Sequence, residues 1–118
     1  MLFFYINIYR TFENYLLTFT DDLDGSIVLG LHPDEATEAI ISTSLNNKLP
    51  FAVIPCCVLP QLFPNRRHKK TKKLIKKLGS FIEYLIDLGQ ESGYNIKITE
   101  LPFEGRNTVL YMSSTDYL

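Results

Sequence analysis

The chain has 118 residues, of which 46% are hydrophobic and 21% are charged, and its formal net charge is −1 at pH 7. A chain of this length corresponds to one small domain or to a piece of a larger one. The composition is that of an ordinary globular protein, which excludes a disordered tail, a collagen-like repeat and a disulfide-rich secreted scaffold.

The near-neutral net charge conceals a strong asymmetry along the chain. Residues 1–59 contain two basic and seven acidic residues, whereas residues 60–118 contain ten basic and six acidic residues. Eight of the twelve Lys and Arg residues lie between Arg66 and Lys77. Such a local concentration of positive charge favours negatively charged partners.

The two cysteines, Cys56 and Cys57, are adjacent in the sequence. Neighbouring cysteines do not form an unstrained disulfide, so we expect a reducing, intracellular location, either cytoplasmic or nuclear. The apolar run Leu2–Tyr9 lacks a basic flank and a small-residue cleavage site, so we expect no signal peptide. No stretch approaches the roughly 20 apolar residues that span a bilayer, so we expect no membrane partner.

The first half of the chain predicts strands and helices in alternation. Leu2–Tyr9 is rich in β-favouring residues and predicts a strand, and Phe12–Phe19 predicts a short helix. The apolar run Ser26–Leu31 predicts a strand that is buried on both faces. His32-Pro33-Asp34-Glu35 then opens a helix that runs to about Asn47, because proline and acidic residues suit a first helical turn.

The second half predicts the longest helix and three further strands. The helix spans Lys69–Leu88, because apolar residues recur at helical spacing from Leu74 onward, and we expect Gly89 and Gly93 to end it. The remaining segments are, in chain order, the strand Phe51–Pro55, the loop Cys57–Arg67, the strand Tyr94–Glu100, the loop Leu101–Asn107 and the strand Thr108–Ser113.

This order predicts an α/β fold with a mostly parallel sheet, right-handed crossovers and helices packed on the sheet. The last two strands are an exception. The loop Leu101–Asn107 is shorter than the dozen or so residues that a parallel crossover needs. We therefore expect the last strand to be antiparallel.

Two strand ends are candidate sites, because ligands of open α/β sheets gather beyond the carboxyl ends of parallel strands. His32 and Asp34 follow one strand and could bind a ligand or move a proton; alternatively, His32 caps the helical turn. Cys56 and Cys57 follow the next strand and could supply a thiolate if a positive field lowers their pKa. The alternative is that they are small core residues.

Several site types have no support in the sequence. The two cysteines and two histidines lack a recognisable metal-ligand spacing, so we expect no metal site. The chain also contains no GxGxxG, GxxxxGKS/T or GxSxG motif.

The basic stretch is a second candidate site. Arg66, Arg67, Lys69 and Lys70 precede or begin the predicted long helix, where positive charge opposes the helix dipole. This unfavourable placement suggests a use, such as binding the phosphates of nucleic acid. The stretch also resembles a nuclear-localisation run. The alternative is a solvated surface, and no aromatic residue within the cluster supports base stacking.

The segment Phe103–Asn107 is a third candidate. Gly105 permits a tight turn with a positive φ. Arg106 and Asn107 either line the crevice at the strand ends or close the hairpin.

Three segments together resemble the C-terminal half of the Rossmann-like S-adenosylmethionine-dependent methyltransferases. They are Gly30–Ile40, Pro50–Val58 and Leu101–Tyr111, and the similarity runs from about Leu23 to Met112. The resemblance implies a seven-stranded class of sheet with its last strand inserted antiparallel, and S-adenosylmethionine as the cofactor. It also implies that His32-Pro33-Asp34 faces the substrate. Some methyltransferases with a comparable paired-cysteine strand end act on tRNA, which suits the basic segment.

The chain departs from that class in its cofactor half. The class holds its cofactor mainly through a glycine-rich loop after the first strand and an acidic residue after the second. Here 22 residues without glycine precede the similarity. We therefore expect these residues alone to bind the cofactor weakly or not at all.

The expected domain organisation follows from the same departure. Residues 23–118 would form the methyltransferase-like part, and residues 1–22 an N-terminal extension. The strand Ser26–Leu31 would have an unpaired edge, and unpaired edges attract further strands. We expect Leu2–Tyr9 to pair there; otherwise a partner chain or a second copy should cover the edge.

Three functional hypotheses remain open at this point. The first is a methyltransferase that is inactive without a cofactor half. The second is a non-catalytic module that binds RNA or an acidic protein through residues 66–77. The third is a gene fragment with no function of its own.

Overall fold

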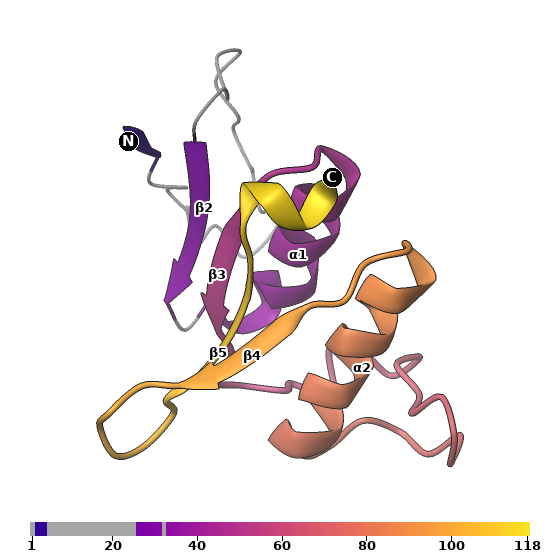
Figure 1. Ribbon diagram of the computed structural model, residues 1–118. Coiled ribbons are helices and arrows are strands. Elements are labelled where there is room, and N and C mark those ends of the chain that lie inside the picture. The colour runs from indigo at the N-terminus through magenta and orange to yellow at the C-terminus, as the bar shows by residue number, and fades with distance from the viewer. Residues whose placement is uncertain (1, 5–25, 32) are drawn as a thin grey trace.

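The computed structural model describes residues 2–4, 26–31 and 33–118, which form an α/β fold (Figure 1). Five strands and two α-helices alternate along these residues, with two short 3-10 helices. In chain order the elements are β1 (Leu2–Phe4), β2 (Ser26–Leu31), η1 (Asp34–Ala36), α1 (Thr37–Asn46), β3 (Phe51–Ile54), α2 (Leu78–Glu91), β4 (Lys97–Glu100), β5 (Thr108–Met112) and η2 (Ser114–Tyr117).

The sheet is mixed, with the strand order β1-β2-β3-β5-β4. Strand β2 pairs in parallel with β3, in a register that places Val28 beside Phe51. Strand β5 is antiparallel to both of its neighbours, β3 and β4. The prediction that β5 is antiparallel is therefore confirmed. The prediction of a mostly parallel sheet is wrong. Strand β5 lies between β3 and β4 instead of at an edge, so it forms two antiparallel pairs, as many as the parallel pairs β1–β2 and β2–β3.

Strand β1 lies at the edge beside β2. Leu2–Phe4 pairs in parallel with Ser26–Val28. The remainder of the predicted strand, 5–9, and the predicted helix Phe12–Phe19 lie outside the described residues. The division of the chain at residue 22 stays a prediction.

Both α-helices contribute to one apolar core against the sheet. Helix α1 contacts β2, β3 and α2, and Figure 1 shows α1 and α2 beside the sheet, with the β4–β5 hairpin projecting at the lower left. The predicted helix after His32 is confirmed over α1 and η1. Fully buried core side chains come from β3, α1, α2 and β5, and include Phe51, Val53, Ile40, Ile41, Phe81, Leu85 and Leu110.

Helix α2 differs from the prediction at its start. It begins at Leu78, nine residues after the predicted start at Lys69. Residues 67–74 form a hairpin-like loop instead, in which Arg67 bridges Leu74 and Lys72 has a φ of 60°. A helix would place several lysines at i, i+3 and i+4, where like charges repel. The loop satisfies its backbone in another way, through hydrogen bonds such as His68 N–H to the Lys73 carbonyl.

The end of helix α2 is set by Gly93. Gly93 has a φ of 88°, and its N–H donates to the Gln90 carbonyl while the Tyr94 N–H donates to the Gly89 carbonyl. This pattern is a Schellman motif, which favours glycine at the left-handed position. Gly89, in contrast, lies inside the helix, so its predicted role as a terminator is wrong.

Candidate functional site

One edge of the sheet gathers the strand ends predicted to carry the site. Because β5 is antiparallel to both neighbours, β2, β3 and β4 run in the same direction and end at the same edge. Pro55-Cys56-Cys57 follows β3 there, and the hairpin 101–107 follows β4. A cleft of about 560 Å³ lies beside these segments. It is lined by Cys56, Cys57, Val58, Leu59, Pro60, Gln61, Lys76, Lys77, Leu78 and Arg106.

The paired cysteines meet in this cleft, and Cys56 is a poor thiolate. Cys56 is half-buried and Cys57 is exposed, and the two sulfur atoms are 3.5 Å apart. Burial, together with the neighbouring Cys57 thiol, raises the pKa of Cys56 to about 11. The positive charge of Arg106 opposes this rise without reversing it. The condition for a reactive thiolate, a lowered pKa, is therefore not met at Cys56.

Three cations from two separate segments line the same cleft. Lys76 and Lys77 immediately precede α2, and Arg106 comes from the β4–β5 hairpin. Among the described residues none of these three side chains has an ion-pair partner. No carboxylate is among the lining residues. The cleft therefore has a positive character that suits an anionic ligand.

In the β4–β5 hairpin, Asn107 closes the loop and Arg106 lines the cleft. The Asn107 side-chain amide donates to the carbonyls of Leu101 and Phe103, at 3.1 and 2.9 Å, and so closes the loop. Gly105 has a φ of 95°, as the tight turn requires. Arg106 instead lines the cleft. The two roles that were predicted as alternatives are therefore both present, each on one of two neighbouring residues.

The end of β2 is only partly described. His32 lies outside the described residues. Asp34 begins η1, whose turn is closed by the Ala36 N–H donating to the Pro33 carbonyl at 3.0 Å. The substrate-facing roles of His32 and Asp34 stay predictions.

Arg66, a predicted nucleic-acid ligand, is buried in the fold. Its side chain is 7% exposed, and Nη2 and Nε donate to one carboxylate oxygen of Glu38 at 2.9 and 3.2 Å. The guanidinium also lies 3.4 Å from the centre of the Phe63 ring. The Tyr84 hydroxyl donates to the other Glu38 oxygen. Arg66 therefore has a structural role through Glu38, and its nucleic-acid contact stays a prediction.

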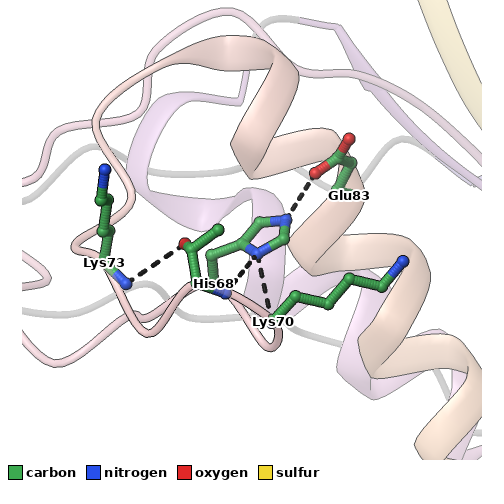
Figure 2. Close-up of polar contacts among 5 residues, drawn as sticks. His68, Lys70, Lys73 and Glu83 are labelled. Carbon is green, nitrogen blue, oxygen red and sulfur yellow. Dashed lines mark hydrogen bonds and ion pairs between the residues drawn. The ribbon is translucent and has the colours of Figure 1, made fainter.

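The rest of the basic segment remains on the surface. Arg67, Lys69 and Lys70 are exposed, and Figure 2 shows how His68 anchors the loop that carries them. His68 Nδ1 accepts hydrogen bonds from the backbone N–H groups of Lys70 and Thr71, at 3.2 and 3.3 Å. His68 Nε2 contacts Glu83 of α2 at 2.6 Å. The imidazole thus joins the turn to the helix while the lysine side chains face solvent.

Sequence reasoning treated Lys76 and Lys77 as surface residues as readily as functional ones. The signal that could have placed them was topological. The helix that follows a strand in a crossover begins near the carboxyl edge of the sheet. The predicted helix begins at Lys69, so it contains Lys76 and Lys77 in its interior. The prediction therefore does not place these two lysines at a helix start near the carboxyl edge of the sheet.

The chain is similar to two curated tRNA methyltransferases. It is 33% identical over 86 residues to a tRNA (uracil-O(2)-)-methyltransferase of Schizosaccharomyces pombe, an alignment that covers 66% of this chain and 16% of the relative. It is 29% identical over 83 residues to a probable tRNA (uracil-O(2)-)-methyltransferase of Caenorhabditis elegans, covering 68% of this chain and 15% of the relative. These similarities support a relationship to RNA methyltransferases. No protein-family model and no solved structure matches the sequence significantly.

The similarity covers a small part of those enzymes. The chain spans about one sixth of the length of the curated relatives that it matches. Within the described residues, no helix is long and apolar enough to cross a membrane.

The described cleft does not fit S-adenosylmethionine. That cofactor carries a positive sulfonium centre, whereas the part of the chain that the structure describes lines the cleft with three cations without ion-pair partners and with no carboxylate. The sequence also offers no glycine-rich loop for the cofactor.

Proposed function

We propose that the chain forms part of a methyltransferase that acts on tRNA, with the described sheet as the C-terminal part of a Rossmann-like domain. The observation that carries the proposal is the similarity to two tRNA (uracil-O(2)-)-methyltransferases. The sheet order supports it, because an antiparallel strand inserted beside the last parallel strand is what the resemblance implies. The positive cleft at the carboxyl edge supports an anionic substrate there. A tRNA substrate would place the protein in the cytoplasm or nucleus.

We propose S-adenosylmethionine as the methyl donor of the complete enzyme, bound mainly by residues that these 118 do not supply. His32 and Asp34 are the proposed substrate-facing pair at the end of β2. Cys56 and Cys57 line the acceptor side, and Cys56 does not attack the acceptor, since the pKa of Cys56 is raised to about 11. Calorimetric titration of the isolated chain with S-adenosylmethionine should show no micromolar binding. Micromolar binding would overturn this division of roles.

A chimaera tests the methyltransferase proposal directly. Replacing the matched segment of the Schizosaccharomyces pombe relative with this chain should leave measurable transfer of labelled methyl groups to unmodified tRNA. The unmodified relative serves as the positive control, and the melting temperature of the chimaera shows whether it folds. A chimaera that folds and binds tRNA but transfers no methyl groups would contradict the proposal.

The alternative is a non-catalytic module that binds RNA or an acidic protein through the basic segment. One observation favours it: Arg67, Lys69 and Lys70 are exposed on a loop that His68 holds in place. Replacing these three cations by Gln should then abolish salt-sensitive RNA retention. Retention that survives this change would reject the loop as the binding element.

A further inference from the structure

We propose that the cleft between the end of β3, the start of α2 and the β4–β5 hairpin binds phosphate groups of an RNA strand, through Lys76, Lys77 and Arg106. The inference deepens the proposed function and depends on RNA being the ligand. It moves the main RNA contact from the exposed loop to the carboxyl edge of the sheet. The strand would then run past the site where the resemblance places the methyl acceptor.

The charges of this cleft differ from those of the other described clefts. A cleft of about 240 Å³ beside Arg67 and His68 also contains Asp87 and Glu91, which offset its positive charge. A cleft of about 310 Å³ contains Arg66, whose charge is already paired with Glu38. In the cleft beside Cys57, the three cations have no partner among the described residues. Unpaired cations that converge from separate segments can neutralise phosphate without first breaking an ion pair.

The backbone at the start of α2 adds to the same field. Leu78, the first residue of the helix, lines the cleft, and Lys77 is its N-cap. The N-cap has no side-chain hydrogen bond and the first turn contains no acidic residue. The positive end of the helix dipole therefore faces the cleft uncompensated, and it reinforces the three side chains.

The size and the wall of the cleft favour a nucleotide over a free inorganic ion. Its volume of about 560 Å³ exceeds what a single phosphate fills. Val58, Leu59 and Pro60 add an apolar wall to the lining of the cleft. Such a wall can pack against the face of a ribose or a base while the cations hold the phosphates. An acidic peptide would satisfy the charges but would leave this wall without a matching surface.

Binding of a labelled single-stranded RNA, measured by fluorescence anisotropy, tests the assignment. The variant Lys76→Gln/Lys77→Gln/Arg106→Gln should weaken binding by about tenfold or more and reduce the slope of log affinity against log salt by about 2. The rival variant Lys69→Gln/Lys70→Gln/Lys72→Gln removes equal charge from the loop and should lose clearly less. Lys48→Gln removes an exposed cation in the turn before β3, away from both segments, and should leave RNA binding nearly unchanged.

Thiol modification reports on the cleft itself. In a Cys56→Ser background, the uncharged reagent iodoacetamide reacts with Cys57, and bound RNA should slow this reaction in proportion to occupancy. Polyglutamate at equal charge concentration should protect less, and inorganic phosphate should not protect at low millimolar concentration.

Three results would overturn the assignment. They are the absence of RNA binding by the unchanged chain at low salt, an equal or larger loss in the loop variant, and binding that leaves Cys57 unprotected. Better protection by polyglutamate would assign the cleft to an acidic protein instead. None of these results depends on methyl transfer, so the chimaera assay tests the proposed function separately.

Discussion

Arg66 shows how one residue of a charged segment can belong to the core. Its guanidinium is paired with Glu38, stacked on Phe63 and 7% exposed. Removing one partner of a buried ion pair leaves the other charge without compensation, which costs more than the pair contributes. The Glu38→Ala variant also deprives the Tyr84 hydroxyl of its acceptor. The network therefore joins α1, the loop after β3 and α2 through one carboxylate.

We expect Glu38→Ala to lower the free energy of unfolding by about 2–4 kcal/mol, because Arg66 stays buried and unpaired. Urea denaturation followed by circular dichroism measures this change. Glu38→Leu combined with Arg66→Met should recover much of the loss, since it removes both charges together. Lys97→Gln, which breaks the exposed pair with Asp116, is the control and should change stability far less. A loss in Glu38→Ala no larger than in this control would contradict the structural role.

The thiol of Cys56 gives a second prediction at the residue scale. Its pKa is raised from 9.0 to about 11, with burial as the first cause and the Cys57 thiol as the second. Only the thiolate attacks alkylating reagents. In the unchanged chain, with the initial labelling of each cysteine resolved by mass spectrometry, iodoacetamide should therefore react slowly with Cys56 at pH 8, and the rate should keep rising beyond pH 10. A plateau near pH 9 would show that the folded chain does not protect this thiol.

The raised pKa of Cys56 also makes the free energy of unfolding depend on pH. The folded state holds the proton more tightly than the unfolded chain, so the contribution of Cys56 to stability is fully present below about pH 9. It is lost as the pH rises from about 9 through 11. Stability measured across this range should therefore fall less in Cys56→Ala than in the unchanged chain.

Helix α2 contains two glycines whose surroundings differ. A Cβ added to Gly89 would lie 2.7 Å from two side-chain carbons of Ile96 and 3.2 Å from the Tyr94 carbonyl oxygen. A Cβ added to Gly79 would meet nothing within 4 Å. Gly89 thus allows the chain before β4 to pack closely against the helix that it has just left.

We expect Gly89→Ala to destabilise the protein by about 1–3 kcal/mol, because buried Ile96 must move and the Tyr94 backbone restricts that movement. Gly79→Ala is the matched control in the same helix and should be neutral or stabilising by up to about 1 kcal/mol. Thermal unfolding measures both changes. Equal effects at the two positions would show that helix propensity, not the contact with Ile96, governs the response.

The basic loop is an element held by one side chain. His68 Nδ1 accepts two backbone N–H groups of the turn and Nε2 contacts Glu83 (Figure 2). His68→Ala removes all three contacts, so trypsin should cleave after Lys69–Lys73 faster than in the unchanged chain. His68→Asn can keep an acceptor near the turn and should be cleaved at an intermediate rate. Cleavage that is as slow in His68→Ala as in the unchanged chain would show that other contacts hold the loop.

The elements also show where sequence patterns succeed and fail. Ser26–Leu31 was predictable as a strand because its apolar run is local information, and β2 has these bounds. The start of α2 was not predictable from the sequence. Leu74 continues the apolar stripe of the helix, which favours an earlier start. The hydrogen bonds of His68 that stabilise the loop instead have no sequence periodicity that would reveal them. The Glu38–Arg66 pair was equally hidden, since it joins residues 28 positions apart. Arg106 was placed at the cleft as one of two alternatives, because loop length alone does not orient a side chain.

At the scale of the whole molecule, the two edges of the sheet are protected in different ways. Strand β4 is exposed along its length and carries Lys97 and Glu100, and charged residues on an edge strand discourage pairing with another chain. At the opposite edge of the sheet, strand β1 covers the apolar strand β2. The protection of β2 therefore depends on a segment distant in sequence. Removing that segment should leave the backbone groups of β2 open to another strand.

We expect a chain that lacks residues 1–22 to self-associate in a concentration-dependent way, whereas the 118-residue chain associates less at the same concentration. Sedimentation velocity distinguishes the two. Lys97→Ala combined with Glu100→Ala is the control for the other edge, and a larger effect from the deletion would show that β2 is the more reactive edge. A truncated chain that stays monomeric with unchanged stability would mean that β1 is not needed to cover β2. In that case the first 22 residues would have to be explained by a role other than the completion of the sheet.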